Sequence, residues 1–386
     1  MKVKLGDIFE IGSGGTPSKS HPEYYGGDIP WVKTGDLKSE YLYEVEDFIT
    51  KEGLKNSSAK LYEPDTVLIA MYGATIGATS ILKMDACTNQ ACAAFKKNDK
   101  VIPEYLYYFL KSQKVKFVKD GVGGAQPNIS AGYLKKVEME LPSLDEQRAI
   151  VEVLDKTTNI MVMRNQEIAS LDNLIKARFV EMFGDMYLNS KGWSEAKLES
   201  MADVVSGITK GRKTKSEDLT EVPYMAVSNV KDGYIDWTTV KTIGATQQEI
   251  EQYRLLADDV LMTEGGDPDK VGRGAIIKEP LENCIHQNHI FRVRLDESVV
   301  LPEYFAEYLQ HQRSKRYFLG CAKQTTGIAS INKTQLRALP VLIPPLSKQE
   351  EFVLFKAQVD KSKVAIQAAL DKSQLLFDSL MQKYFG

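Results

Sequence analysis

The chain has 386 residues, of which 43% are hydrophobic and 26% charged, and its formal net charge is −3. These values are ordinary for a globular protein and exclude an intrinsically disordered chain, while the length favours at least two domains. The N-terminus lacks an apolar signal region and no apolar run approaches the ~18 residues of a membrane span, so we expect a cytoplasmic protein. The four cysteines form no CxxC pair, which fits reduced thiols.

The first globular part, residues 1–141, is predicted to mix strands and helices. Residues 66–70 form a short β-branched run bounded by turn residues, which is typical of a strand. Residues 105–117 have helical spacing and follow a Pro-Glu start, with the proline near the first turn. The pattern therefore predicts an α+β fold for this part.

Residues 142–184 are predicted to form one long helix. Its start carries Pro142 and a capping-box pair, Ser143 and Glu146, and Gly184 stands where a helix-ending glycine belongs. Apolar residues recur at alternating steps of four and three, which indicates a coiled-coil seam. The apolar seam residues are Ile150, Leu154, Met161, Ile168, Leu171, Ile175 and Met182, interrupted by the polar residues Thr157, Arg164 and Arg178.

The second half of the chain, globular residues 185–343 and helix 344–386, repeats the first. Within the two helices the matching residues, such as Gln147 and Gln349, are 202 positions apart, and Ile29–Val32 recurs as Val222–Met225 with an offset of 193. The intervening loops do not match, which suggests one kind of task performed on two different targets. The second seam consists of Phe352, Val359, Ile366, Leu370, Phe377 and Leu380, with the polar residues Lys356, Lys363 and Ser373.

The two apolar seams need a partner, and the most economical partner of each helix is the other. We therefore predict two globular domains joined by two long antiparallel helices, that is, an intramolecular coiled coil with a pseudo-twofold internal repeat.

Catalytic and metal-binding patterns are weak. The stretch from Gly207 to Thr214 has the wrong spacing for a phosphate-binding loop, and we find no methyltransferase, nuclease or Ser-His-Asp pattern, so no catalytic residue is proposed. Cys284, His286 and His289 have metal-ligand side chains, but they lie in a strand-like run whose first-half counterpart has no histidine. A strand is the favoured interpretation there, and no metal site is predicted.

The loops offer hydrogen-bonding side chains among glycines, together with a few cations. Such side chains can read base edges and contact phosphates, although polar loops are also the default for any globular protein. The candidates for DNA binding are, in the first half, Ser13, Thr16, Ser18, Lys19, Lys33, Thr34, Tyr72, Thr75, Gln126 and Asn128, and, in the second, Thr209, Lys210, Arg212, Lys213, Ser228, Asn229, Arg273, Gln324, Thr325 and Asn332.

In this layout the chain resembles the specificity (S) subunit of a type I restriction–modification system. The resemblance rests on the GSGGTPS…YYGGDIPWVKTGDL opening, on GGAQPNIS at 123–130, and on the LPSLDEQ entry to the first long helix with its echo IPPLSKQ at 343–349. It covers essentially the whole chain. The second half departs from it, because TTGIASIN replaces GGAQPNIS there.

The resemblance implies a DNA-reading subunit without an active site or a cofactor of its own. Each globular part would be a target-recognition domain that reads one half of a bipartite, asymmetric DNA sequence, and the helices would set the spacing between the half-sites. Two modification (M) subunits would bring S-adenosylmethionine and methylate adenines. Restriction (R) subunits, with ATP and Mg²⁺, are a further partner that the resemblance allows.

Two other classes of function are open on the residues alone. One is a coiled-coil scaffold whose globular parts bind protein or peptide, and the other is a two-domain enzyme acting on a small molecule.

Overall fold

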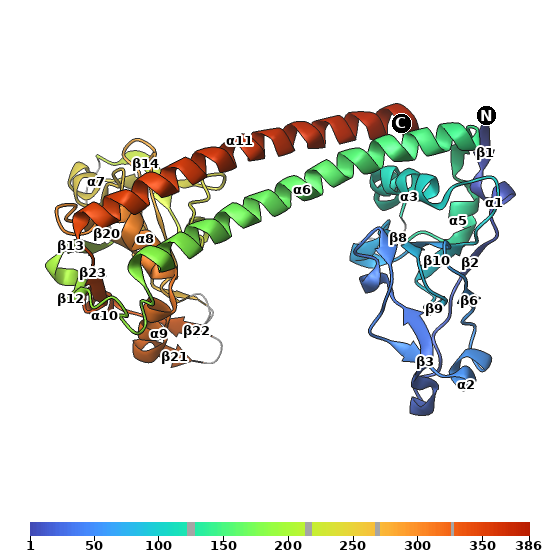
Figure 1. The fold of residues 1–386 in the computed structure, drawn as a ribbon, viewed down its shortest axis with the longest axis horizontal. Coiled ribbons are helices and arrows are strands. Elements are labelled where there is room, and N and C mark those ends of the chain that lie inside the picture. Colours follow the sequence, from blue (N-terminus) through green and yellow to red (C-terminus); the bar gives the residue numbers. More distant parts are fainter. Residues whose placement is uncertain (122–127, 213–217, 267–270, 326–327) are drawn as a thin grey trace. The chain divides into compact units, whose positions relative to one another are not determined.

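The computed structural model describes residues 1–121, 128–212, 218–266, 271–325 and 328–386, which form two compact units (Figure 1). Unit 1 comprises Met1–Gln166 and Gln367–Gly386, and unit 2 comprises Glu167–Ile366. Each unit thus contains one globular part and a portion of each long helix.

Both long helices are confirmed. Helix α6 spans Leu144–Phe183 and helix α11 spans Leu346–Phe385. The capping box of α6 forms as predicted, because the Ser143 amide donates to the Glu146 carboxylate at 2.9 Å and the Glu146 amide donates to the Ser143 hydroxyl at 3.3 Å. Gly184 adopts φ +78°, the left-handed conformation that ends a helix.

The two helices pair antiparallel in each unit. In unit 1 the start of α6, with Val151 and Leu154, shares a hydrophobic cluster with the end of α11, with Phe377 and Met381. In unit 2 the end of α6 and the start of α11 share a second cluster. All thirteen predicted apolar seam residues are buried or half-buried.

Some polar seam residues have partners on the facing helix. In unit 1 Arg164 donates to the Ala369 carbonyl and to the Ser373 hydroxyl, rather than facing an apolar side chain. In unit 2 Lys363 pairs with Asp172 at 2.5 Å. Such pairs specify one register of a helix pair.

The globular part of unit 1 combines strands with short helices. A two-stranded sheet pairs β1 with β11, a five-stranded sheet has the order β2-β10-β7-β8-β4, and a four-stranded sheet has the order β5-β3-β9-β6. The strands are β1 (Lys2–Lys4), β2 (Ile11–Ser13), β3 (Tyr25–Val32), β4 (Tyr41–Leu42), β5 (Phe48–Ile49), β6 (Leu61–Tyr62), β7 (Val67–Ala70), β8 (Thr79–Leu82), β9 (Ala86–Thr88), β10 (Cys92–Phe95) and β11 (Glu138–Glu140). The short helices are α1 (Leu5–Ile8), η1 (Pro22–Tyr24), η2 (Thr34–Asp36), α2 (Lys51–Lys55), η3 (Gly73–Thr75), α3 (Pro103–Ser112), α4 (Lys114–Asp120) and α5 (Ala131–Lys136).

Unit 2 has the same build with a smaller main sheet. Its sheets have the orders β12-β23, β13-β20-β16-β18, β15-β14-β19 and β17-β22-β21. The strands are β12 (Ser194–Lys197), β13 (Ala202–Ser206), β14 (Thr220–Met225), β15 (Lys241–Ala245), β16 (Val260–Thr263), β17 (Gly265–Gly266), β18 (Gly274–Ile276), β19 (Ile285–His286), β20 (Ile290–Leu295), β21 (Lys323–Thr325), β22 (Ile328–Ser330) and β23 (Pro340–Ile343). The short helices are η4 (Leu198–Ser200), η5 (Val227–Asn229), α7 (Gln247–Tyr253), α8 (Pro302–Gln310), α9 (Gln312–Cys321) and α10 (Lys333–Arg337).

The helix predicted at 105–117 is divided at Gln113 into α3 and α4, and its counterpart is divided at His311 into α8 and α9. Phe117 in α4 and Phe318 in α9 are both fully buried. The α+β class and the internal repeat are confirmed.

One repeated residue joins each globular part to its long helix. Gln147 accepts from the Ile102 amide at 2.9 Å and donates to the Lys100 and Pro142 carbonyls at 3.0 Å each. Gln349 accepts from the Leu301 amide at 2.8 Å and donates to the carbonyls of Val299 and Pro344. Both glutamines are fully buried, and each satisfies three backbone groups at the junction.

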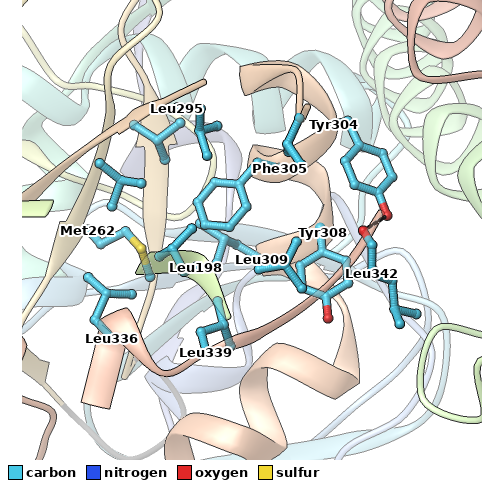
Figure 2. Packing of buried hydrophobic residues seen from close by; sticks show 14 of the residues in the cluster. Leu198, Met262, Leu295, Tyr304, Phe305, Tyr308, Leu309, Leu336, Leu339 and Leu342 are labelled. Atoms are coloured by element: carbon cyan, nitrogen blue, oxygen red, sulfur yellow. Dashed lines mark hydrogen bonds between the residues drawn. The ribbon is translucent and has the colours of Figure 1, made fainter. Parts of the chain in front are cut away.

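The largest core lies in unit 2 and is built around α8 (Figure 2). Phe305 and Leu309 are buried among leucines from neighbouring elements, such as Leu198 and Leu339, and the hydroxyl of Tyr304 donates to the Leu342 carbonyl at 2.9 Å. In unit 1 Tyr105 makes the matching bond to the Glu140 carbonyl at 3.0 Å. The aromatic residues after each Pro-Glu start therefore fix the helix against β11 or β23.

Candidate nucleic-acid interface

In unit 1 three strand ends meet at the β9–β10 connection, residues 89–91. The Asn89 amide donates to the carbonyl of Val32, the last residue of β3, at 2.9 Å, and the Met71 amide, just after β7, donates to the Ala91 carbonyl at 2.8 Å. The loop after β2 is held by the Gly15 amide, which donates to the Thr88 carbonyl at 2.9 Å. The loops that follow β2, β3 and β7 therefore emerge at one edge.

Unit 2 repeats this arrangement around the β19–β20 connection, residues 287–289. The Gln287 amide donates to the carbonyl of Met225, the last residue of β14, at 3.0 Å, and the Glu264 amide, just after β16, donates to the His289 carbonyl at 3.0 Å. The loop after β13 is attached by the Asn288 amide, which donates to the Ile208 carbonyl at 3.0 Å.

A glycine makes each convergence possible. A Cβ atom on Gly14 would lie 1.9 Å from the Thr88 carbonyl oxygen, and one on Gly207 would lie 1.8 Å from the His286 carbonyl oxygen. Real Cβ atoms do not approach backbone that closely, so only glycine fits at either place.

The structure brings the described first-half candidates to these loops. Ser13, the last residue of β2, is exposed, as are Ser18 and Lys19 in the loop after it. Lys33 and Thr34 are half-buried beyond β3, and Thr16 donates to Gln90 of the connection. Beyond β7 come the exposed Tyr72 and the half-buried Thr75, and the exposed Asn128 pairs with Tyr72 in a β-bridge. Lys33 is partly engaged already, since its ammonium lies 2.5 Å from Asp47. Gln126 lies outside the described residues.

The second-half candidates are less uniform. Thr209 and Lys210 are exposed beyond β13, and Ser228 is exposed beyond β14. Arg273 is half-buried just before β18, and the exposed Asn332 caps α10 by accepting from the Gln335 amide at 2.9 Å. Gln324 and Thr325 lie in β21, and Lys213 lies outside the described residues.

Two candidate side chains are already engaged in hydrogen bonds or an ion pair within unit 2. Asn229 is fully buried: its side chain accepts from the Ala226 amide and donates to the Asp236 carbonyl at 2.9 Å each. Arg212 forms a bidentate pair with Glu249, with bonds of 2.6 and 2.5 Å, which holds the pKa of Glu249 down at about 2. Neither side chain is free to contact DNA in this conformation.

Lys111, in α3, packs against α11. Lys111 is over the ring of Phe377, on α11, with its ammonium 5.8 Å from the ring centroid. Burial among these rings lowers the pKa of Lys111. Lys111 therefore belongs to the packing of α3 against α11.

The two connections themselves were not predicted as part of the site. Gln90, Asn288 and His289 sit where the loops converge, and His289 is exposed and hydrogen-bonded through Nδ1 to Glu264 at 2.5 Å. The signal was present, because NQ and QNH interrupt otherwise buried strand runs in both halves.

The run from Cys284 to His289 is a short strand followed by a connection. His286 is fully buried and bonds to the Ile290 carbonyl through Nδ1 at 3.1 Å. Burial, together with the charge of Arg292, lowers its pKa to about 4. The described residues hold no group of three or more His, Cys, Asp or Glu side chains arranged for a metal ion. Nor does any described helix have the length and apolar character to span a membrane.

The comparisons with known proteins agree on one family. The family model for the type I restriction modification DNA specificity domain matches residues 1–173 and 190–373. The type I restriction enzyme MjaIX specificity subunit of Methanocaldococcus jannaschii is 30% identical over 60% of this chain and 58% of its own length. The EcoKI specificity subunit of Escherichia coli is 21% identical over 92% of this chain and 82% of its own length.

Solved structures share the fold at lower identity. The S subunit of a type I restriction–modification system from M. genitalium covers the whole chain with a TM-score of 0.55 and 16% identity. A chain from a study of complex assembly and conformational transition in a type I system aligns with a TM-score of 0.65 and 17% identity. With two copies of the family domain, one in each half, the chain belongs to the type I restriction–modification DNA specificity family.

Proposed function

We propose that this chain is the DNA-recognition subunit of a type I restriction–modification complex. Unit 1 would read one half of a bipartite, asymmetric target with the loops beyond β2, β3 and β7, and unit 2 would read the other half with the loops around residues 287–289. The observation that carries the proposal is the pair of convergence points, which share their strands and glycine but present different loops. Residues that must recognise different bases are expected to differ in this way.

Exposed cations at these loops include Lys19 in unit 1 and Lys210 in unit 2. Phosphate contacts usually dominate DNA affinity, and the net charge of this chain is only −3. The isolated chain should therefore bind DNA weakly and in a salt-dependent manner, with partner subunits supplying further phosphate contacts. Nanomolar binding of one bipartite site by the chain alone at physiological salt would contradict this part of the proposal.

The partners and the chemistry belong to the same proposal. Two modification subunits would dock on α6 and α11 and supply S-adenosylmethionine, and restriction subunits, where the system has them, would use ATP and Mg²⁺. The chain itself would be non-catalytic and would act in the cytoplasm. The paired helices would set the spacing between half-sites.

The test is a domain exchange read by sequencing methylated DNA from cells. Replacing residues 1–140 with the same region of another specificity subunit should change one half-site and leave the other half-site and the spacing unchanged. Inserting four residues next to Thr157 adds about one helical turn, or ~6 Å, and should lengthen the spacing while both half-sites stay the same. If the insertion altered the half-sites, the role of the helices would be wrong. If the complex methylated no defined sequence, a protein-binding scaffold would be the better interpretation.

A further inference from the structure

The two convergence points share a backbone arrangement but differ in the side chains at one pair of positions. In unit 1 the Met71 amide donates to the Ala91 carbonyl at 2.8 Å, and in unit 2 the Glu264 amide donates to the His289 carbonyl at 3.0 Å. Met71 therefore corresponds to Glu264, and Ala91 corresponds to His289. Unit 1 has two apolar side chains at these positions, whereas unit 2 has a carboxylate and an imidazole.

In unit 2 the carboxylate orients the imidazole. Nδ1 of His289 lies 2.5 Å from Oε2 of Glu264, and the two side chains are 56% and 32% exposed. A carboxylate only accepts hydrogen bonds, so Nδ1 carries a proton and donates it to Glu264, which leaves Nε2 of the neutral ring as an acceptor. The side chain of Asn288 fits this tautomer, because its amide nitrogen lies 3.4 Å from Nε2 and can only donate.

The backbone beneath the imidazole is fixed as well. The carbonyl of His289 accepts from Glu264, and the amide of the preceding residue, Asn288, donates to the Ile208 carbonyl at 3.0 Å. The following residue, Ile290, begins β20 and is fully buried. The exposed ring therefore stands on an immobilised base, and a side chain that is already ordered loses little conformational entropy when it binds.

A fixed acceptor of this kind distinguishes between bases. In the major groove adenine and cytosine present amino groups, N6 and N4, whereas guanine presents the acceptors O6 and N7 and thymine presents O4. Nε2 can accept from an amino group, but it would face the lone pairs of guanine or thymine without a hydrogen bond. Leaving such groups unpaired in an interface is what makes polar contacts selective.

From this geometry we infer that His289 is a specificity-determining residue that reads one base of the half-site assigned to unit 2. The base carries an exocyclic amino group in the major groove, as adenine and cytosine do, and Nε2 accepts a hydrogen bond from it. Glu264 is a positioning residue that holds the ring in the accepting tautomer. Unit 1, with Ala91 and Met71, lacks this contact. The inference rests on the proposed function and deepens it, because it names the chemical class of one base.

The test uses the complex of the full chain with modification subunits. Sequencing of methylated DNA gives the two half-sites, and fluorescence polarisation then compares duplexes that carry each possible base pair at each position of the half-site read by unit 2. The native complex should have one position at which an amino-bearing base binds at least ~10-fold more tightly than guanine or thymine. In His289→Ala this preference should fall below ~3-fold, while the other positions and the first half-site keep theirs.

Two variants separate base reading from a structural role. His289→Lys can still pair with Glu264 but has only donors, so the preference at the same position should move towards guanine. In Glu264→Gln the side-chain amide can donate to Nδ1, which admits the tautomer that donates from Nε2, so discrimination at that position should fall several-fold. Glu282→Gln removes the same charge from an exposed residue ahead of β19 and is the matched control, which should behave like the native complex.

The outcomes distinguish this inference from the proposed function. If His289 only stabilised the connection, its variants would weaken binding to every duplex alike and the preferred base would not move, which would overturn the inference. An unchanged preference in His289→Ala would overturn it as well. Should His289→Ala fail to assemble, the shift towards guanine in His289→Lys decides. If the native complex has two defined half-sites but no position responds to His289, the inference alone is wrong, whereas a native complex without any preferred bases would contradict the proposed function itself.

Discussion

The junctions between the globular parts and the long helices differ from the loop-bearing edges in how far the repeat is kept. At the junctions, Gln147 and Gln349 make the same three hydrogen bonds in both units. At the loop-bearing edges only the backbone arrangement and one glycine are kept, and Thr88 of unit 1 is replaced by His286 in unit 2. Side chains are thus repeated where both halves are held alike, and they differ at the edges that we propose read the two half-sites.

The change from repeated structure to unrelated loop sequence occurs directly after one glycine in each unit. Gly14 and Gly207 fit against backbone atoms that both units share, yet the loops beyond them have unrelated sequences. The structure shared by the two units therefore extends to the base of each loop. Four sets of substitutions test where this similarity ends.

The largest effect is expected at these glycines. Gly207→Ala places a Cβ 1.8 Å from the His286 carbonyl oxygen, so the backbone must shift, and we expect a loss of about 5 kcal/mol in the free energy of unfolding of unit 2. Gly14→Ala should do the same to unit 1. Gly35→Ala is the matched control, because its Cβ would meet nothing within 4 Å. Equal urea midpoints for Gly207→Ala and Gly35→Ala would show that the close approach is unimportant.

The next effect concerns the junctions. Gln349→Leu leaves the Leu301 amide and two carbonyls buried without partners, which should cost about 4 kcal/mol, measured by urea unfolding. Gln147→Leu should have a comparable effect in unit 1, since the bonds are the same. Gln358→Leu on the exposed face of α11 serves as the control and should change stability by less than about 0.5 kcal/mol. A tenfold difference between the effects of the two junction variants would argue against equivalent roles.

A pH dependence should distinguish the two units. His286 is neutral in the folded chain because burial lowers its pKa to about 4, whereas in the unfolded chain it takes up a proton below about 6.5. The contribution of neutral His286 to the free energy of unfolding is therefore fully present above about pH 6.5. It decreases by about 3 kcal/mol in total as the pH drops towards 4. Replacing His286 with the residue of unit 1, His286→Thr, should remove this component. Identical slopes of unfolding free energy against pH in the native chain and the variant would rule it out.

The smallest effect is expected from the exposed cations of the loops. Lys19→Ala and Lys210→Ala should each weaken DNA binding by the assembled complex a few-fold and reduce the slope of log affinity against log salt by about one. Lys2→Ala, exposed in β1 and opposite Glu140 of β11, is the control. No change in the salt slope would mean that neither lysine contacts a phosphate.

Much of the architecture could be predicted from local patterns, and most of the site could not. The long helices are visible because their seams repeat over 40 residues, and the internal repeat is visible because its anchors are apolar or turn residues. The ion pair of Arg212 could not be predicted, because its partner Glu249 is 37 residues away in the sequence. Asn229 has a loop-like sequence environment, yet its side chain is used in hydrogen bonds to the backbone of its own turn. The convergence at residues 89–91 and 287–289 depends on long-range strand pairing, which spacing alone does not reveal.

Arg164 restricts how the two long helices can align with each other. If α6 moved by one turn relative to α11, the guanidinium would leave Ser373 and the Ala369 carbonyl and stay half-buried without a partner. Losing two hydrogen bonds to a half-buried charged group costs about 3 kcal/mol, which corresponds to fewer than about one molecule in a hundred. A population of these chains would thus be nearly homogeneous in helix alignment, so that a single arginine suppresses alternative forms that the apolar seam would tolerate.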